Sequence, residues 1–369
     1  MSDFLVVGGG AIGLSLAWEL AQRGQEVCVV DQQQVGRATS WVGAGIFPPP
    51  KVNDLHDPME RLRTHSHELH VEWSQRLLAE TGINTGLTRC GGLYLARKPG
   101  EAVALRVEMS QAAADGVALV ELTRAETVTR EPNLASIADD IEAAFFLPDE
   151  MQLRSPRYLQ ALYAACEKAG VTFHPNLEIE RVSIKGNRVT ELVTVAGETL
   201  TATHYCICGG TWSAKLLEPL GICLPVEPWR GQLVLWKTPE PLVQHIVNEG
   251  LRYLVPRRDG HLLVGATVED VGFDDQTTEA AIDELCQYAT ELLPDLAGIR
   301  YEKAFAGLRP KTPDGHPFMD RVQGITNLSL SAGHYRSGLH LSPISAVFMA
   351  DLLLQDNPPL DPAPFRINR

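Results

Sequence analysis

The hydrophobic and polar positions at the start of the chain predict one βαβ unit. Residues 4–10, FLVVGGG, form a short apolar run that ends in glycines, a pattern typical of a buried parallel strand before a tight turn. In residues 11–23 the apolar positions recur at helical spacing, and Gly24 ends the predicted helix. Residues 26–31, EVCVVD, are a second apolar run. Strand, helix and strand therefore follow one another within about thirty residues.

The rest of the chain alternates helical patterns with short apolar runs. Residues 32–51 are rich in Gly, Ser, Thr and Pro and predict an extended loop. Periodicity predicts helices over residues 56–81, 100–116, 157–170, 277–293 and about 342–354. Short runs predict strands over residues 91–96, 171–173, 192–195, 204–208, 232–237, 253–256, 261–264 and 328–331, with residues 257–260 as a hairpin turn.

Three glycines at the first strand-to-helix junction form a GxGxxG motif. Gly8 permits the turn, Gly10 lets the backbone approach a pyrophosphate, and Gly13 lets helix and strand pack closely. Asp31 ends the second strand, where a carboxylate can bind ribose hydroxyls. The alternative is a glycine-rich turn without a ligand. The motif predicts a dinucleotide but does not separate FAD from NAD, and a second small-residue loop at residues 36–46 can approach another planar or phosphate group.

Composition excludes several classes of function. The chain has 369 residues, 44% hydrophobic and 21% charged, which predicts a globular protein with two structural units. The formal net charge of −14 argues against nucleic-acid binding, although one buried Arg can still bind an anionic substrate. Seven scattered cysteines favour a reducing compartment over a disulfide framework. We find no signal-peptide pattern and no apolar stretch of the ~18–20 residues that a membrane helix needs, so we expect a cytoplasmic protein with no membrane partner.

Two other clusters invite a metal or redox interpretation. Cys206 and Cys208 point the same way from one predicted strand, lack CxxC spacing and have no second ligand pair, which favours buried structural thiols. His65, His67 and His70 lie close together on a predicted helix, but no acidic pattern accompanies them. We therefore interpret that segment as a surface helix and expect no metal site.

The order of these segments resembles the D-amino acid oxidase superfamily of flavoproteins, and within it the glycine oxidases of thiamine biosynthesis. The resemblance covers nearly the whole chain. It is carried by VVGGGAIG at 6–13, the acid at 31, ATSWVGAGI at 38–46, CGGTWS at 208–213, RYLVPRRDGHLLVGAT at 252–267, AGLRPKTPDGHPFMD at 306–320 and SAGHYRSGLHLSP at 331–343.

This resemblance implies an α/β protein in which a Rossmann-like FAD-binding domain is interleaved with an antiparallel-sheet α+β substrate domain. The FAD-binding domain would comprise residues 1–85, 150–225 and 306–369, and the substrate-binding domain residues 86–149 and 226–305. Some relatives hold flavin through a cysteine after the arginine strand. Residues 310–315 contain none, so non-covalent FAD is expected.

Carried over residue by residue, the resemblance assigns a cofactor surface and a substrate site. The cofactor residues would be Gly8, Gly10, Ala11, Ile12, Gly13, Asp31, Gln32, Ala38, Thr39, Ala44, Gly45, Ile46, Ile179, His334, Tyr335, Arg336, Ser337, Gly338, Leu339 and His340. The substrate residues would be Arg309, Tyr253 and Arg336. The planar guanidinium group of arginine can bind a carboxylate through two parallel hydrogen bonds. The alternatives are that Arg309 forms an internal ion pair, that Tyr253 is a packed core residue and that Arg336 only stabilises its loop. The loop at Trp41, Val42 and Gly43 has one more residue than is usual in the family.

The implied activity is oxidative deamination of glycine, N-methylglycine or a small D-amino acid. Hydride would pass from Cα to flavin N5, giving an oxo acid, ammonia or an amine, and hydrogen peroxide from dioxygen. No catalytic acid or base is needed, because the flavin supplies the difficult step. The alternatives are an FAD-dependent D-amino acid dehydrogenase that passes electrons to a quinone or carrier, an NAD-dependent dehydrogenase, and a flavin-binding module without turnover. The resemblance also suggests a homotetramer.

Overall fold

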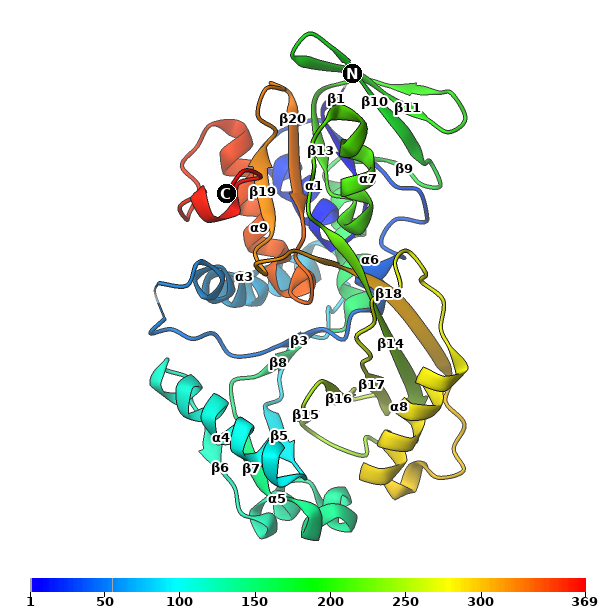
Figure 1. Cartoon of the computed structure of the whole chain (residues 1–369). Helices are drawn as coiled ribbons and strands as arrows, with labels where there is room; N and C mark the ends of the chain where they lie inside the picture. The colour runs from blue at the N-terminus through cyan, green and yellow to red at the C-terminus, as the bar shows by residue number, and fades with distance from the viewer. Residues whose placement is uncertain (1, 55) are drawn as a thin grey trace.

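Two sheets dominate the computed structural model, which describes residues 2–54 and 56–369 (Figure 1). The first has the strand order β19-β20-β13-β1-β2-β9. All neighbours in it are parallel except the edge pair β19–β20. Its strands are β1 (Ser2–Val7), β2 (Val27–Val30), β9 (Thr172–His174), β13 (Ala202–Ile207), β19 (Phe318–Arg321) and β20 (Leu328–Ala332). This is the nucleotide-binding type of sheet that the βαβ pattern predicts.

Four helices, two packed on the first sheet and two packed on those helices, form the largest apolar core. They are α1 (Ala11–Gln22), α3 (Pro58–Thr81), α6 (Ser155–Lys168) and α9 (Gly338–Leu354). Helix α1 contacts both α6 and α9, so segments from opposite ends of the chain lie side by side. Trp18 and Trp73 meet edge to face in this core with ring centroids 4.7 Å apart. Burial of this apolar surface is the main stabilisation of the nucleotide side.

The second sheet has the strand order β18-β14-β17-β16-β15-β5-β7-β6. Its pairs are antiparallel except β5–β15. The strands are β5 (Gly92–Ala96), β6 (Val120–Glu121), β7 (Ala143–Leu147), β14 (Glu227–Lys237), β15 (Ile246–Glu249), β16 (Arg252–Pro256), β17 (His261–Gly265) and β18 (Lys303–Lys311). A second core packs under it against α8 (Glu279–Leu292), and α4 (Pro99–Ala114) packs at its other end. The predicted α/β fold with an interleaved antiparallel sheet is confirmed.

Short elements complete the chain. Two three-stranded sheets have the orders β10-β11-β12 and β3-β8-β4. Their strands are β3 (Ile46–Phe47), β4 (Thr88–Arg89), β8 (Met151–Gln152), β10 (Ile179–Lys185), β11 (Arg188–Thr194) and β12 (Thr199–Leu200). The short helices are α2 (Thr39–Val42), α5 (Arg124–Arg130) and α7 (Ser213–Leu217), with 3-10 turns η1 (Pro132–Asp140), η2 (Gly210–Trp212), η3 (Glu218–Leu220), η4 (Pro294–Leu296) and η5 (Ala363–Phe365).

Two predicted elements are wrong in detail. The segment 32–51 is not all extended loop, because it contains α2 and β3. Helix α9 begins at Gly338, not near Ser342. Proline is common in the first turn of a helix, so Pro343 suggested a start near residue 342. The helix in fact begins about one turn earlier and contains Pro343.

The division into two domains stays a prediction. Strand β18 runs through the proposed boundary at residue 306 and pairs with β14 along Lys303–Lys311. It therefore carries residues of the predicted FAD-binding domain into the second sheet. Across residues 2–54 and 56–369, no helix combines the length and apolarity that crossing a membrane requires.

Candidate active site

One large cavity, of about 970 Å³, lies between the two sheets. The ends of β1, β2 and β13 contribute Val7, Val30 and Ile207 to its wall, and β14, β16 and β18 of the second sheet form the opposite side. The carboxyl ends of parallel strands are where open α/β sheets bind nucleotides. The volume is at the upper end of the range for ligand sites, roughly 300–1,000 Å³.

The glycine motif is shaped by two close backbone approaches. Gly8 has φ +102°, and a Cβ there would lie 2.5 Å from the carbonyl oxygen of Cys208. A Cβ on Gly13 would lie 1.8 Å from the Gly8 carbonyl oxygen. Gly13 is not among the residues that line the cavity, and its assignment to the cofactor stays a prediction. Its role is the close strand-to-helix packing that the motif requires.

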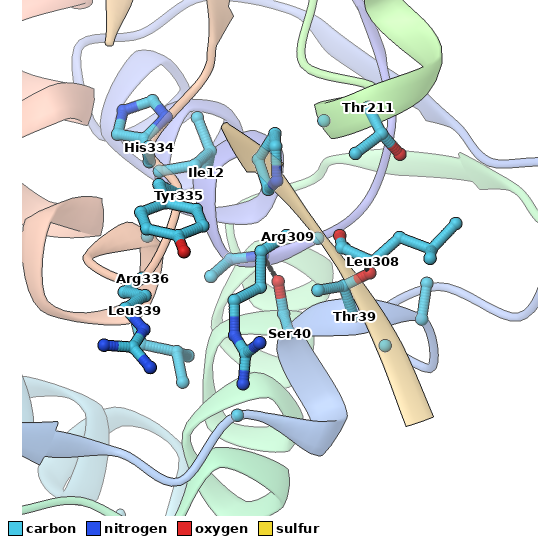
Figure 2. A pocket seen from close by; sticks show the side chains of 18 of the residues that line it. Ile12, Thr39, Ser40, Thr211, Leu308, Arg309, His334, Tyr335, Arg336 and Leu339 are labelled. Carbon is cyan, nitrogen blue, oxygen red and sulfur yellow. Dashed lines mark hydrogen bonds between the residues drawn. The ribbon is translucent and has the colours of Figure 1, made fainter. Parts of the chain in front are cut away.

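Asp31 and Ser40 fix the two small-residue loops. The Asp31 carboxylate accepts hydrogen bonds from the backbone N–H of Gly9 at 2.7 Å and of Gln33 at 2.8 Å. Burial raises the pKa of Asp31, and the two backbone donors partly oppose that rise. Ser40 Oγ accepts from the Ala11 N–H at 3.0 Å, which ties α2 to the start of α1 (Figure 2).

A buried histidine holds the start of α9. Pro343 cannot donate to the Leu339 carbonyl four residues earlier. His70 Nε2 lies 3.0 Å from that carbonyl and 2.9 Å from the His340 carbonyl, so it is the N–H donor to both. His67 and His70 are buried between α3 and α9, and only His65 is exposed, so the surface-helix interpretation is wrong. Within the described ranges no group of three or more His, Cys, Asp or Glu could hold a metal ion.

The thiol interpretation is confirmed. Cys206 and Cys208 are buried and free. Burial raises the pKa of Cys206 to about 12 and that of Cys208 well above its ordinary value. Neither thiol is therefore ionised near neutral pH, and both serve as small apolar side chains.

The Arg309 guanidinium occupies space on the second sheet that is open because Gly231 has no side chain. Its Nη1 donates to the carbonyls of Thr267 at 3.0 Å and Arg230 at 3.4 Å. A Cβ on Gly231, on the neighbouring strand, would lie 2.0 Å from Nη2 of Arg309. Desolvation lowers the pKa of Arg309, and the nearby Tyr253 opposes that shift. No carboxylate pairs with Arg309 among the residues the structure describes, so the internal ion pair is not what holds it.

Tyr253 and Arg336 flank Arg309. A Cβ on Gly265 would lie 2.8 Å from the Tyr253 ring and hydroxyl, so this glycine makes room for the ring. Burial raises the pKa of Tyr253, while Arg309 and Arg336 oppose the rise. Figure 2 shows the guanidinium groups of Arg309 and Arg336 extending in the same direction, from β18 and from the loop before α9. These three side chains surround one part of the cavity.

Comparison with known proteins decides the family. A family model described as FAD dependent oxidoreductase matches residues 3–352. The chain belongs to this family of FAD-dependent oxidoreductases. A glycine oxidase from Pseudomonas putida is 36% identical over 367 residues, covering 98% of this chain and 97% of that protein. The predicted recognition and the predicted enzyme class, an FAD-dependent amino acid oxidoreductase, are both confirmed.

Solved structures agree with this assignment. A glycine oxidase from Geobacillus kaustophilus superposes with a TM-score of 0.92 at 30% identity, covering 100% of this chain and 98% of that one. An L-proline dehydrogenase from P. horikoshii has a TM-score of 0.85 at 22% identity, covering 100% of this chain and 97% of that one. At that identity the second likeness concerns the fold alone.

The FAD-dependent oxidoreductase cavity contains polar atoms that fit a large polar cofactor. Thr211 Oγ1, Ser213 Oγ, Ser331 Oγ and His340 Nε2 line it, are buried and have no hydrogen-bond partner within the described residues. Buried polar atoms are normally hydrogen-bonded, so four unpaired atoms along one cavity indicate a ligand with many hydrogen-bond donors and acceptors, such as hydroxyl, phosphate and ring nitrogen groups. The residues present therefore fit FAD.

The structure brings nearly all the predicted site residues to this cavity. Apart from Gly13, every predicted cofactor and substrate residue lines it. Among the described residues, sequence reasoning missed Thr211, Ser213, Ser331 and Asn248. Thr211 and Ser213 lie within the CGGTWS segment, whose family match could have identified them. Asn248 carries no comparable signal, because it stands alone in an ordinary strand pattern.

Proposed function

We propose that this protein oxidises glycine, or an amino acid of similar size such as N-methylglycine or a small D-amino acid, with dioxygen as the electron acceptor. The products would be an oxo acid, ammonia or an amine, and hydrogen peroxide. Bound FAD would supply the oxidising step at the Cα–H bond. The names of the relatives, glycine oxidases in two organisms, support the substrate class.

The observation that carries the proposal is the free face of the Arg309 guanidinium. Its hydrogen bonds go to backbone carbonyls, and desolvation lowers its pKa, so an anionic ligand at this point would be strongly favoured. We assign the substrate carboxylate to Arg309 and Tyr253, with Arg336 closing the site from the loop before α9. Side-chain atoms beyond the substrate Cα would meet Leu233 and Tyr253, which line the cavity.

The protein groups in this proposal orient and desolvate the substrate. Arg309 and Tyr253 hold the carboxylate, and the apolar surroundings favour the neutral amine over the ammonium ion. No acid or base is assigned. For the cofactor we assign the phosphates and ribose to Gly8, Gly10, Ala11, Ile12, Asp31 and Gln32, the adenine side to Ile179, and the remaining contacts to Ala38, Thr39, Ala44, Gly45, Ile46 and residues 334–340.

A substrate panel tests the proposal. The purified holoprotein is mixed without air with glycine, N-methylglycine, D-alanine and L-alanine, and loss of the flavin absorbance is followed. We expect the first three to reduce the flavin and L-alanine to leave it oxidised. Peroxide release on admitting air would support an oxidase. Reduction that is reversed by a quinone, with no peroxide in air, would favour the dehydrogenase alternative, and no reduction by any amino acid would refute the proposal.

A further inference from the structure

Three polar side chains form a row across the second sheet beside the substrate arginine. Asn248 on β15 lies directly opposite Tyr253 on the antiparallel strand β16 and beside Tyr94 on the parallel strand β5. Residues in direct register share a face of the sheet, so these side chains are neighbours. Asn248 and Tyr253 both line the cavity, and Tyr94 is not among the lining residues. Asn248 is therefore the next polar group along from the proposed carboxylate site.

A fully buried carboxyl group lies behind Asn248. Glu150 has no exposed surface, and its Oε1 accepts a hydrogen bond from Asn248 Nδ2 at 3.2 Å. Gly92 leaves room for it, since a Cβ there would lie 2.1 Å from Glu150 Oε2. No salt bridge reaches Glu150 in the part of the chain that the structure describes, and burial raises its pKa to about 7. In its ionised form Glu150 can only accept hydrogen bonds, so it pairs with the Nδ2 end of the amide.

The contact with Glu150 decides which way the Asn248 amide faces. An amide has a donor end and an acceptor end, and the hydrogen-bond network determines their assignment. Since Nδ2 is directed to Glu150, Oδ1 is the end left for the cavity. The hydrogen bonds within the described residues give Oδ1 no donor. The cavity wall therefore presents a cluster of donors at Arg309 and Tyr253 and an acceptor at Asn248.

This division matches the two polar ends of a small amino acid. The carboxylate accepts hydrogen bonds and fits the donors, whereas the amino group donates and fits an acceptor. We propose that Asn248 binds the substrate amino group through Oδ1, and that Glu150 is a positioning residue that keeps this oxygen facing the cavity. The inference rests on the proposed function, because it takes the substrate to be an amino acid held at Arg309. The inference identifies the residue that binds the substrate amino group, which is the group that a plain carboxylic acid lacks.

Two ligands separate this role from simple cavity shape. Acetate has the carboxylate but no amine, and its Kd is measured from the change in flavin absorbance. Glycine has both groups, and its Kd is measured from the concentration dependence of flavin reduction without air. Asn248→Leu keeps the size of the side chain but removes the acceptor. We expect the Kd for glycine to rise about tenfold, as loss of one hydrogen bond implies, with the Kd for acetate unchanged.

Two further variants complete the experiment. Asn248→Asp retains an oxygen toward the cavity, so glycine binding should stay within about threefold of wild type. Asn133→Leu removes an exposed amide outside the cavity wall and serves as the matched control, with both Kd values unchanged. FAD content is measured for each variant. If Asn248→Leu does not retain FAD, Asn248→Ala replaces it, because alanine also lacks the acceptor; if Asn248→Asp does not, Asn248→Ser replaces it, because serine keeps one.

The outcomes distinguish this inference from the proposed function. Equal weakening of acetate and glycine in Asn248→Leu would make Asn248 a cavity-shaping residue and overturn the inference. No weakening of either ligand would overturn it as well. If the wild-type flavin is not reduced by any small amino acid, the proposed function itself fails. If glycine reduces the wild-type flavin but Asn248→Leu does not change the preference for glycine over acetate, the proposed function stands and the assignment of Asn248 fails.

Discussion

The two walls of the cavity are built by different means. The wall beside the first sheet is rich in glycine and other small residues, from the turn at residues 8–12, the loop at 38–46 and the start of α9, and we call it the backbone wall. The wall on the second sheet consists of individual side chains, chiefly Arg309, Tyr253 and Asn248. A backbone wall recognises phosphates and hydroxyls common to a cofactor class, whereas single side chains select one small ligand. The two walls should therefore respond differently to substitution.

Glycine shows the difference most directly. On the first wall Gly13 makes room for a carbonyl oxygen, which cannot move without displacing the strand. On the second wall Gly231 makes room for the far end of Arg309, which can rotate away. The same residue type therefore supports the fold in one place and a ligand contact in the other.

The largest effect is expected from Gly13→Ala. Its Cβ would lie 1.8 Å from the Gly8 carbonyl oxygen, so the turn or the helix must shift. We expect loss of bound FAD and a fall in unfolding free energy of about 3 kcal/mol or more, since overpacking a rigid site costs about 1–3 kcal/mol or more. Gly100→Ala is the matched control, because nothing lies within 4 Å of its Cβ position. A Gly13→Ala protein that purifies yellow with an unchanged Tm would contradict the account of the backbone wall.

Arg309→Ala should affect the other wall alone. Removing the guanidinium leaves the substrate carboxylate without its charged partner, which costs about 2–5 kcal/mol, or roughly 30- to several-thousand-fold in kcat/KM. FAD content and Tm should stay near the wild-type values, because Arg309 contributes no ion pair to the described fold. Arg309→Lys keeps the charge but loses the fork and should fall in between. Steady-state kinetics with glycine measure the effect. An unchanged kcat/KM in Arg309→Ala would show that this residue does not bind the substrate.

Gly231→Ala is a milder perturbation of the same wall. The added Cβ would lie 2.0 Å from Arg309 Nη2 and should push the guanidinium aside without removing it. We expect KM to rise about tenfold, which is roughly 1.4 kcal/mol, with FAD retained. Gly307 lies directly opposite Gly231 on β18, and its Cβ position has only ordinary contacts from 3.4 Å, so Gly307→Ala should have a smaller effect. Equal effects of the two substitutions would mean that Arg309 is not the cause.

The comparison also explains what the sequence could predict. The backbone wall depends on local rules, in which three glycines, two apolar strands and an acid occur within the first 31 residues. The parallel sheet and most of the cofactor surface could therefore be predicted. Arg309 and Tyr253 were found through family resemblance, since they are 56 positions apart and meet only across paired strands.

What sequence reasoning missed lies where tertiary contacts replace local rules. The start of α9 was misplaced because Pro343 resembles a first-turn residue. The helix extends one turn earlier because His70, more than 260 residues away, pairs with the carbonyl that Pro343 leaves free. The same contact buries the histidines that their polarity suggested were on the surface. Asn248, which we propose as the amine ligand, is hydrogen-bonded to Glu150 from the turn between β7 and β8.

The smallest effect is expected at His70, whose side chain holds the start of α9 in the backbone wall. Burial lowers the pKa of His70 to about 4 from 6.5 in the unfolded chain. Between pH 6.5 and 4 the unfolded chain therefore binds a proton that the folded protein excludes, so stability is complete above pH 6.5 and declines below it. One such group contributes at most about 1.4 kcal/mol per pH unit.

His70→Gln keeps an N–H donor for the α9 carbonyls but does not titrate, so its unfolding free energy should fall less steeply with acid than that of wild type. Urea unfolding at pH 7, 6 and 5 measures the difference, and His65→Gln, an exposed position on the same helix, should retain the wild-type slope. Identical slopes for all three proteins would mean that the charge of His70 does not govern this wall, leaving His334, buried beside the same cavity, as the titrating group to substitute next.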